Sequence, residues 1–157
     1  MASYKFVTEW RFDAPIAKVW DEIAHPERWP EWWKAVESVV TLKTGDADGI
    51  GTVRQYTWRG ALPYRLKFDM RTTLIEKPVR LEGEASGELQ GRGRWTLSPE
   101  SQSTFVRYDW EVDATKAWMR VLSPLARPIF EWNHDTVMRW GFDGLKRQLG
   151  NRPDGGR

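Results

Sequence analysis

Apolar and polar residues alternate at the start of the chain. The apolar-side positions of this pattern are Tyr4, Phe6, Thr8, Trp10 and Phe12. A period of two is typical of a strand with one buried face, because successive side chains of a strand point to opposite sides. We therefore expect the chain to open with a strand over residues 4–12.

Two short helices are expected after this strand. Apolar residues recur there at helical spacing, first as Ile16, Val19, Trp20 and Ile23 and then as Trp29, Trp32, Trp33 and Val36. Asp13 is suited to cap the first helix, with Pro15 in its first turn. His25 and Pro26 mark the end of that helix. Each helix has one apolar face to pack against the rest of the domain.

The middle of the chain has the pattern of consecutive antiparallel strands. Alternation continues from residue 37 to 113, and turn-forming residues interrupt it at 45–49, 59–60, 77–78, 87 and 98–101. One set of alternate positions is apolar and the other is charged, which fits a sheet with one wet face better than a parallel sheet covered on both faces. We expect a curved antiparallel sheet of about six to seven strands, with the charged positions forming ion pairs on its outer face.

A long helix is predicted at the end of the chain. Ser123 and Pro124 resemble a helix start, and Pro128 either kinks the helix or begins its main body. From Pro128 to Leu149 the helix would be about 33 Å long, enough to cross a whole sheet. The pattern thus predicts an α+β fold in which a curved sheet wraps around a long C-terminal helix.

Length and composition favour one domain over residues 1–150, with a flexible tail over residues 151–157. The 157 residues suffice for one hydrophobic core, and 11 Trp, 4 Tyr and 6 Phe make it unusually aromatic. The chain lacks the roughly 20 consecutive apolar residues of a membrane span and the apolar segment of a secretory signal. We expect a cytoplasmic protein, as a monomer or a homodimer.

Several function classes are disfavoured by the same inventory. The chain has no cysteine and two histidines, so we expect no metal site. Dinucleotide and nucleophile-elbow motifs are missing, so no cofactor is expected. The net charge of +2 comes from interleaved acidic and basic residues, which does not favour nucleic acid as a partner.

Small residues at mid-element positions point to a cavity. Gly83, Gly91 and Gly93 occupy apolar-side positions of two strands, and Gly141 lies on a face of the terminal helix. Missing side-chain volume on both walls leaves room for a ligand, although glycine also admits neighbouring rings or sharp strand bends. The expected ligand-binding residues are these four glycines with Arg54, Tyr56, Trp58, Tyr64, Phe68, Met70, Trp95, Tyr108, Trp110, Asn133 and Val137.

Arg54 is the most informative polar residue of the expected cavity. It shares the inward positions of its strand with Tyr56 and Trp58. A buried guanidinium needs an acceptor, so Arg54 either orients a ligand carboxylate or enolate or pairs with a protein carboxylate near the mouth.

His134 is the other candidate for chemistry. A neutral imidazole near pH 7 is suited to move a proton in a cyclisation or dehydration. The alternative, favoured by the flanking Glu131 and Asp135, is an ordinary histidine on the helix surface.

Four segments resemble the polyketide cyclase/dehydrase and lipid-transport branch of the START-like (SRPBCC) superfamily. They are residues 12–20 (FDAPIAKVW), 29–33 (WPEWW), 62–70 (LPYRLKFDM) and 126–135 (ARPIFEWNHD). The resemblance implies the helix-grip fold, similar to START and Bet v 1 proteins, with an apolar cavity between sheet and terminal helix. It implies no single reaction, because one fold serves many functions.

Three functions follow from the resemblance and the residues together. The first is binding of a hydrophobic lipid-, polyketide- or aromatic-type small molecule. The second is a cofactor-independent cyclase, aromatase or dehydratase that uses the same cavity. The third is a co-chaperone-like interaction module with exposed tryptophans.

Overall fold

The computed structural model describes residues 2–115 and 117–151, with the backbone alone for residues 2, 114, 117–124, 126 and 151. The predicted tail over 151–157 lies outside the described residues, apart from Asn151, which ends the last helix.

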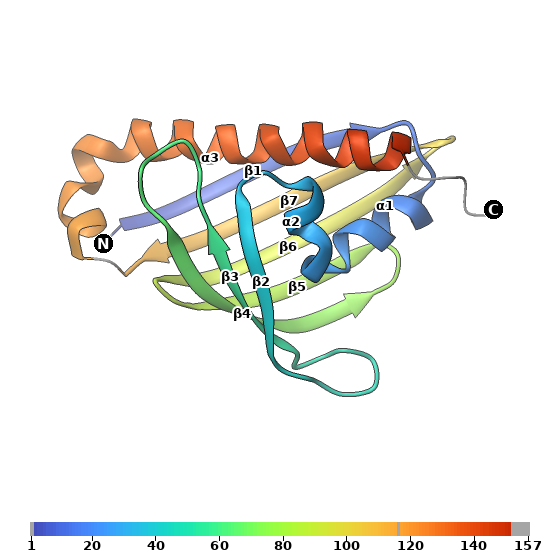
Figure 1. Cartoon of the computed structure of the whole chain (residues 1–157), viewed down its shortest axis with the longest axis horizontal. Helices are drawn as coiled ribbons and strands as arrows, with labels where there is room; N and C mark the ends of the chain where they lie inside the picture. The colour runs from blue at the N-terminus through green and yellow to red at the C-terminus, as the bar shows by residue number, and fades with distance from the viewer. Residues whose placement is uncertain (1, 116, 152–157) are drawn as a thin grey trace.

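Within the described residues, seven strands form one antiparallel sheet in the order β1-β7-β6-β5-β4-β3-β2. The strands are β1 (Ala2–Phe12), β2 (Val36–Lys43), β3 (Val53–Trp58), β4 (Leu66–Glu76), β5 (Arg80–Gly87), β6 (Leu89–Glu100) and β7 (Ser103–Ala114). The helices are α1 (Ile16–Ile23), the 3-10 turn η1 (Pro26–Arg28), α2 (Trp29–Trp32) and α3 (Ala117–Asn151). This is the expected helix-grip architecture, with α3 across the sheet (Figure 1).

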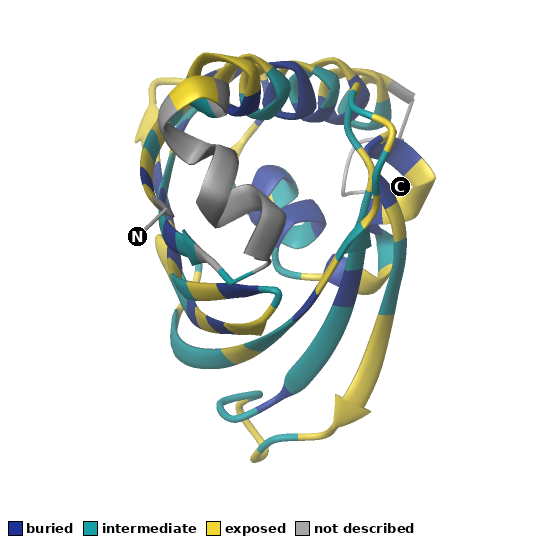
Figure 2. Cartoon of the chain, turned by 90° about the vertical axis from the view of Figure 1, so that its left-hand side faces the viewer, coloured by how far each residue is buried: buried dark blue, intermediate teal, exposed yellow. Residues whose placement is uncertain are grey.

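The inner face of the curved sheet carries the apolar set of alternate residues, as the period-two pattern predicted. On β6 the buried residues are Leu89, Gly93, Trp95 and Leu97, while Arg92 and Arg94 between them are exposed. Seen along the sheet, the strands curl beneath α3 and enclose α1 and α2 (Figure 2). The charged set lies outside and forms the expected ion pairs, such as Arg71 with Glu84 at 2.9 Å.

Two expectations about local structure were wrong. The residue at the N-cap of α1 is Pro15, not Asp13 as expected. The Asp13 carboxylate instead accepts a hydrogen bond from Ser103 Oγ at 2.9 Å, and this contact joins the end of β1 to the start of β7. The second short helix ends at Trp32, and Val36 already begins β2. Trp33 leaves the helix in an extended conformation because its indole is drawn beneath α3.

The turn expected at 98–101 is shorter than predicted. β6 continues through Pro99 to Glu100, and β7 begins at Ser103, so only two residues make the turn. Ser101 adopts a positive φ of 60° there. Pro99 is tolerated because it lies at the end of the strand, where little pairing remains to be lost.

The terminal helix is longer than predicted. It begins at Ala117 rather than at Pro128, so both Pro124 and Pro128 lie inside it. Proline removes a backbone donor and bends a helix, and Figure 1 shows the first part of α3 turned away from the long remainder. No helix in the described part of the chain has the length and apolar character needed to cross a membrane.

Two glycines let α3 lie close against the segment around α2. A Cβ atom at Gly141 would come within 2.5 Å of Cε2 of Trp33, and one at Gly144 would collide with the backbone oxygen of Trp32. The Trp33 indole donates a hydrogen bond from Nε1 to the backbone oxygen of Val137 at 2.9 Å. Gly141 therefore serves tight packing, and the expectation that it borders a cavity was wrong.

We predict that Gly141→Ala lowers the free energy of unfolding by up to about 2 kcal/mol, because overpacking at Trp33 costs about 1–3 kcal/mol and the helix preference of alanine offsets roughly 1 kcal/mol of this. Gly150→Ala is the matched control, since no atom lies within 4 Å of its added Cβ, and it should not destabilise. Urea unfolding of both variants measures the difference. If the Gly141→Ala protein were as stable as the Gly150→Ala protein, the Trp33 ring would have to move aside for the extra methyl group without cost.

Candidate functional site

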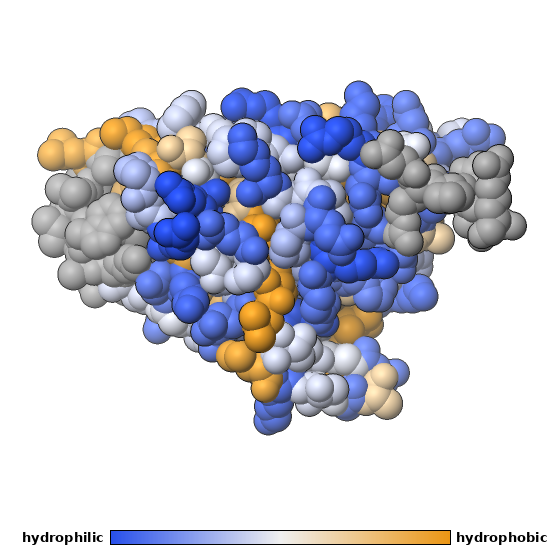
Figure 3. All heavy atoms as spheres, viewed as in Figure 1, coloured by the Kyte–Doolittle hydropathy of each residue, from blue (hydrophilic) through white to orange (hydrophobic). Residues whose placement is uncertain are grey.

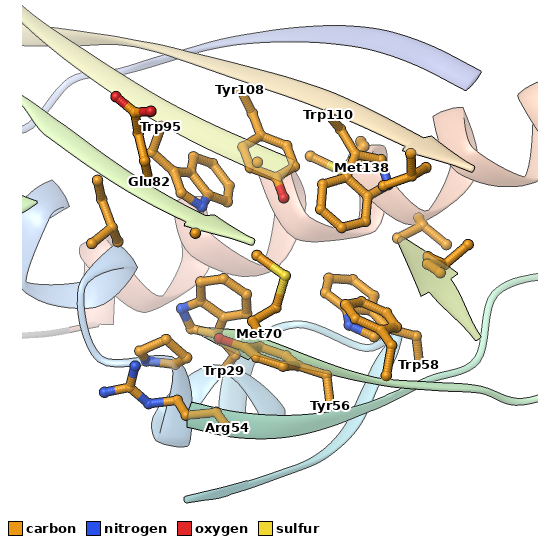
Figure 4. Close-up of a pocket in the computed structure, with 18 of the residues that line it drawn as sticks. Trp29, Arg54, Tyr56, Trp58, Met70, Glu82, Trp95, Tyr108, Trp110 and Met138 are labelled. Carbon is orange, nitrogen blue, oxygen red and sulfur yellow. The ribbon is translucent and has the colours of Figure 1, made fainter. Parts of the chain in front are cut away.

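A cavity of about 450 Å³ lies between the inner face of the sheet and α3. Its walls come from β1, β3–β7, α1, η1, α2, α3 and the loops between them, and apolar atoms dominate the lining. Figure 4 shows the labelled side chains of opposite walls pointing toward one another across this space. The cavity exists because the sheet curls while the straight part of α3 spans it.

Aromatic rings make up much of the wall. The upper group in Figure 4 includes Trp95 and Tyr108, stacked with ring centroids 4.1 Å apart, and Trp110 beside them. Across the cavity, Tyr56 stacks on Phe68 at 5.9 Å. Such rings offer flat apolar faces with fixed positions, which suits a planar ligand.

The remaining predicted side chains of the wall lie where the sequence pattern put them. Trp58, Tyr64, Met70 and Val137 all line the cavity. Burial, and secondarily the neighbouring Tyr4, raise the pKa of the Tyr64 hydroxyl. Met70 extends from β4 into the space between the two ring groups (Figure 4).

Two of the predicted strand glycines form part of the cavity wall. Gly83 and Gly93 are directly opposite each other in the β5–β6 pair, and both are buried. A Cβ atom at Gly93 would lie 2.6 Å from the Tyr108 hydroxyl, and one at Gly83 would lie 3.0 Å from Cε of Met70. The absence of side chains at Gly83 and Gly93 therefore leaves room for Met70 and Tyr108, which also line the cavity.

Gly91 does not take part in the cavity, and its predicted place was wrong. It has a φ of 153° and lies against the backbone of Glu111 and Val112. It borders a separate shallow groove on the outside of the sheet, with Lys5 and Arg92. Gly91 thus allows a close approach of β6 and β7, a role that the sequence did not indicate.

Tyr56 and Tyr108 are the two tyrosines of the lining whose phenol groups are buried most deeply. Burial raises the pKa of both Tyr56 and Tyr108, so both remain protonated at neutral pH. Each phenol can donate one hydrogen bond and accept others. They are suited to orient a ligand oxygen without introducing charge.

Arg54 lies at one end of the cavity, with its side chain 19% exposed. Its Nε donates a hydrogen bond to Oε2 of Glu27 at 2.7 Å, and its Nη1 lies 3.5 Å from Oγ1 of Thr72. Of the two interpretations drawn from the sequence, pairing with a protein carboxylate is the one observed. Glu27 gave no signal in the sequence, because it lies on η1, 27 residues before its partner.

His134 is buried in the cavity wall, and the expectation of a surface histidine was wrong. Its side chain is 14% exposed, and its ring stacks on Phe6 with centroids 3.8 Å apart. Its Nδ1 is buried without a hydrogen-bond partner among the described atoms. Burial lowers the pKa of the imidazole to about 4, so it is neutral at physiological pH.

Asn133 has a structural contact that the sequence did not indicate. Its Oδ1 accepts hydrogen bonds from the backbone N–H groups of Ala61, at 2.7 Å, and Leu62, at 3.2 Å. It thereby fixes the β3–β4 connection to α3 at the edge of the cavity, which it also lines.

Sequence reasoning missed several lining residues. They include Tyr4, Phe6, Trp29, Leu66, Leu89, Val112, Phe130 and Met138. The alternation of β1 already placed Tyr4 and Phe6 on the apolar face, so the signal was present. Phe130 and Met138 were not predicted because the face of α3 turned to the sheet depends on packing with Trp33.

Residues 3–150 match the family model described as polyketide cyclase / dehydrase and lipid transport. The chain belongs to this family. The match covers nearly the whole sequence, as the four resembling segments led us to expect. No curated protein matches the chain significantly.

Several solved structures have a similar fold at low sequence identity. The Zhui aromatase/cyclase from Streptomyces sp. R1128 is 14% identical, with a TM-score of 0.79 and 98% of each chain covered. A START superfamily protein from Mycobacterium smegmatis is 12% identical, with a TM-score of 0.70 and 93% and 97% covered. The di-domain ARO/CYC BexL of the BE-7585A biosynthetic pathway is 20% identical, with a TM-score of 0.74, and this chain spans 52% of it. At these identities the likeness shows the shared fold alone.

We predict that His134 makes stability depend on pH. Because its folded pKa of about 4 lies below the ordinary 6.5, the unfolded chain binds a proton first as the pH falls. The contribution of the neutral His134 imidazole to the free energy of unfolding is fully present above pH 6.5. It is lost as the pH falls from 6.5 to about 4. His134→Phe, which keeps a ring against Phe6 but cannot titrate, should lack this loss.

Urea unfolding of both proteins between pH 7 and pH 4 measures the effect. The stability of the wild type should fall relative to the variant by at most about 1.4 kcal/mol per pH unit in that window. Parallel curves for the two proteins would show that the imidazole titrates normally and is not buried as described.

Proposed function

We propose that this protein binds a hydrophobic, ring-containing small molecule in the cavity between the sheet and α3. The observation that carries the proposal is a cavity of about 450 Å³ whose opposite walls present aromatic faces. Ligand sites of this size are usually concave and apolar, with a few polar groups that fix orientation.

Recognition in this proposal comes mainly from apolar contact. Burial of a ring contributes roughly 25 cal/mol for each Å² removed from water. Phe68, Trp95 and Trp110 would supply the faces, and the hydroxyl groups of Tyr56 and Tyr108 would select among orientations. Empty space lined by rings costs stability when nothing fills it, so a ligand also restores lost contacts.

A cyclase- or aromatase-type reaction in the same cavity is a second candidate. Two observations support it: the structural likeness to aromatase/cyclases and the neutral imidazole of His134 beside the cavity. The lowered pKa makes this imidazole a weak base, so its part in such a reaction would be to hold a carbonyl or enol oxygen of a chain bound between the rings by a hydrogen bond. His134→Phe should then lower turnover more than it lowers affinity for an apolar ring compound.

The interaction-module hypothesis has less support. It requires exposed tryptophans, whereas most of those whose side chains the structure describes are buried. Among the described tryptophans, Trp58 and Trp140 are partly buried and Trp132 on α3 is exposed, at 54%.

We predict that Met70→Trp weakens ligand binding. The indole would occupy the space between the two ring groups, where Met70 now lies (Figure 4). The affinity for N-phenyl-1-naphthylamine, a neutral fluorescent probe, should fall by about tenfold or more, a loss of at least roughly 1.4 kcal/mol. Titration of probe fluorescence measures this, and native mass spectrometry tests for a co-purified small molecule.

Val40→Trp is the matched control. Val40 is 51% exposed on β2, so the same added ring there should leave probe affinity unchanged. Undiminished binding to a folded Met70→Trp protein would place the ligand outside the cavity and contradict the proposal.

A further inference from the structure

The salt bridge between Arg54 and Glu27 joins β3 to η1 at one end of the cavity. Oε2 of Glu27 accepts from Nε of Arg54 at 2.7 Å and from Oγ1 of Thr41 at 3.0 Å. Two donors from neighbouring strands thus hold this carboxylate in place. The Arg54 side chain is the more buried partner, and it is the one that lines the cavity.

The Glu27 carboxylate is ionised at neutral pH. Burial raises its pKa, but hydrogen bonds from Arg54 and Thr41 and the charge of Arg54 outweigh burial, and the pKa is lowered overall. The guanidinium is charged at any physiological pH. The pair therefore brings one positive and one negative charge to this end of the cavity, with no net charge.

The other polar groups of the lining leave the interior uncharged as well. Tyr56 and Tyr108 are protonated, and His134 is neutral. Glu82 pairs with Arg94 at 3.3 Å on the rim. The remaining charged side chains of the lining are Asp48 and Lys77, which are opposite in sign and exposed to water.

Within this lining the largely buried cation is Arg54, which is already paired, whereas Lys77 is a cation exposed to water. A carboxylate that reached Arg54 would also lie a few ångströms from Glu27, and the two like charges would repel each other. Burying a charge without a partner is costly, whereas a neutral oxygen can accept a hydrogen bond from the guanidinium without displacing Glu27.

We propose that Glu27 is a specificity-determining residue, which withholds the charge of Arg54 from anions so that the cavity accepts uncharged ring compounds bearing hydroxyl or carbonyl oxygens. This inference rests on the proposed ligand-binding function and names the class of ligand. Arg54 acts in it as a hydrogen-bond donor to a neutral oxygen.

The test compares two ligands that share one ring system, 2-naphthol and 2-naphthoate. Near pH 7 the first is neutral and the second is an anion. Calorimetric titration of the wild type should show binding of 2-naphthol that is tighter by about tenfold or more. This comparison needs no variant, and tighter binding of 2-naphthoate would overturn the inference.

Glu27→Gln should remove most of this selectivity. Freed from its counter-charge, Arg54 would bind 2-naphthoate about tenfold more tightly than in the wild type, with 2-naphthol affected much less. Combining Glu27→Gln with Arg54→Met should remove that gain. Unchanged 2-naphthoate affinity in a folded Glu27→Gln protein would overturn the role of Glu27.

Glu37→Gln is the control for net charge. Glu37 forms a comparable ion pair, with Arg65 at 2.6 Å, on the outside of the sheet. The Glu37→Gln substitution changes the net charge by the same amount as Glu27→Gln. It should leave the affinities for 2-naphthol and 2-naphthoate as in the wild type. An equal gain in 2-naphthoate affinity with this control would mean that overall charge, not Glu27, sets the selectivity.

N-phenyl-1-naphthylamine separates failure of this inference from failure of the proposed function. If this probe binds in the cavity but neither 2-naphthol nor 2-naphthoate does, the cavity binds apolar rings without selecting for an oxygen substituent. That result would overturn the inference and leave the proposed function standing. If none of the three binds, the proposed function falls with it.

Discussion

The contact between Trp33 and α3 determines where the terminal helix lies, and the cavity depends on it. The indole fills the space left by Gly141 and donates a hydrogen bond to the backbone of Val137. Trp33 is almost fully buried among Trp10, Trp29 and Trp58. This cluster holds one side of α3 against α2, while the sheet curls away beneath the rest of the helix and leaves the cavity open.

The same arrangement separates a packed half of the domain from a hollow half. Trp33 and Leu97, each 1% exposed, lie in the packed half. In the hollow half, residues of β3–β7 and α3 line the cavity, among them Gly83 and Gly93, which lie opposite each other. Hydrophilic residues cover most of the described surface in Figure 3, and a strip of hydrophobic residues interrupts them.

The fold was largely predictable from the sequence, because alternation of apolar residues follows directly from the geometry of a half-buried strand. Tyr56, Phe68 and Trp110 were assigned to the inner face for that reason alone. The family resemblance added the position of the terminal helix. Local details failed where tertiary packing overrides local preference, as at Trp33, which leaves its helix to pack beneath α3.

The candidate site was less predictable for the same physical reason. Whether a glycine borders the cavity depends on what surrounds it in the fold: rings lie against both Gly93 and Gly141, yet only Gly93 of these two lines the cavity. The burial of His134 depends on its stacking with Phe6, more than 120 residues away. The partner of Arg54 lies on a turn whose direction no periodicity encodes. Long-range contacts of this kind appear only when the chain is folded.

A ring compound bound between the sheet and α3 would lie among Met70, Met138 and the aromatic walls, all of which line the cavity. Nuclear Overhauser contacts from bound N-phenyl-1-naphthylamine to isotope-labelled methionine methyl groups report this position. We expect contacts from the probe's ring protons to the ε-methyl groups of both Met70 and Met138. Binding of the probe without a contact to either methyl group would show that the ring compound binds elsewhere.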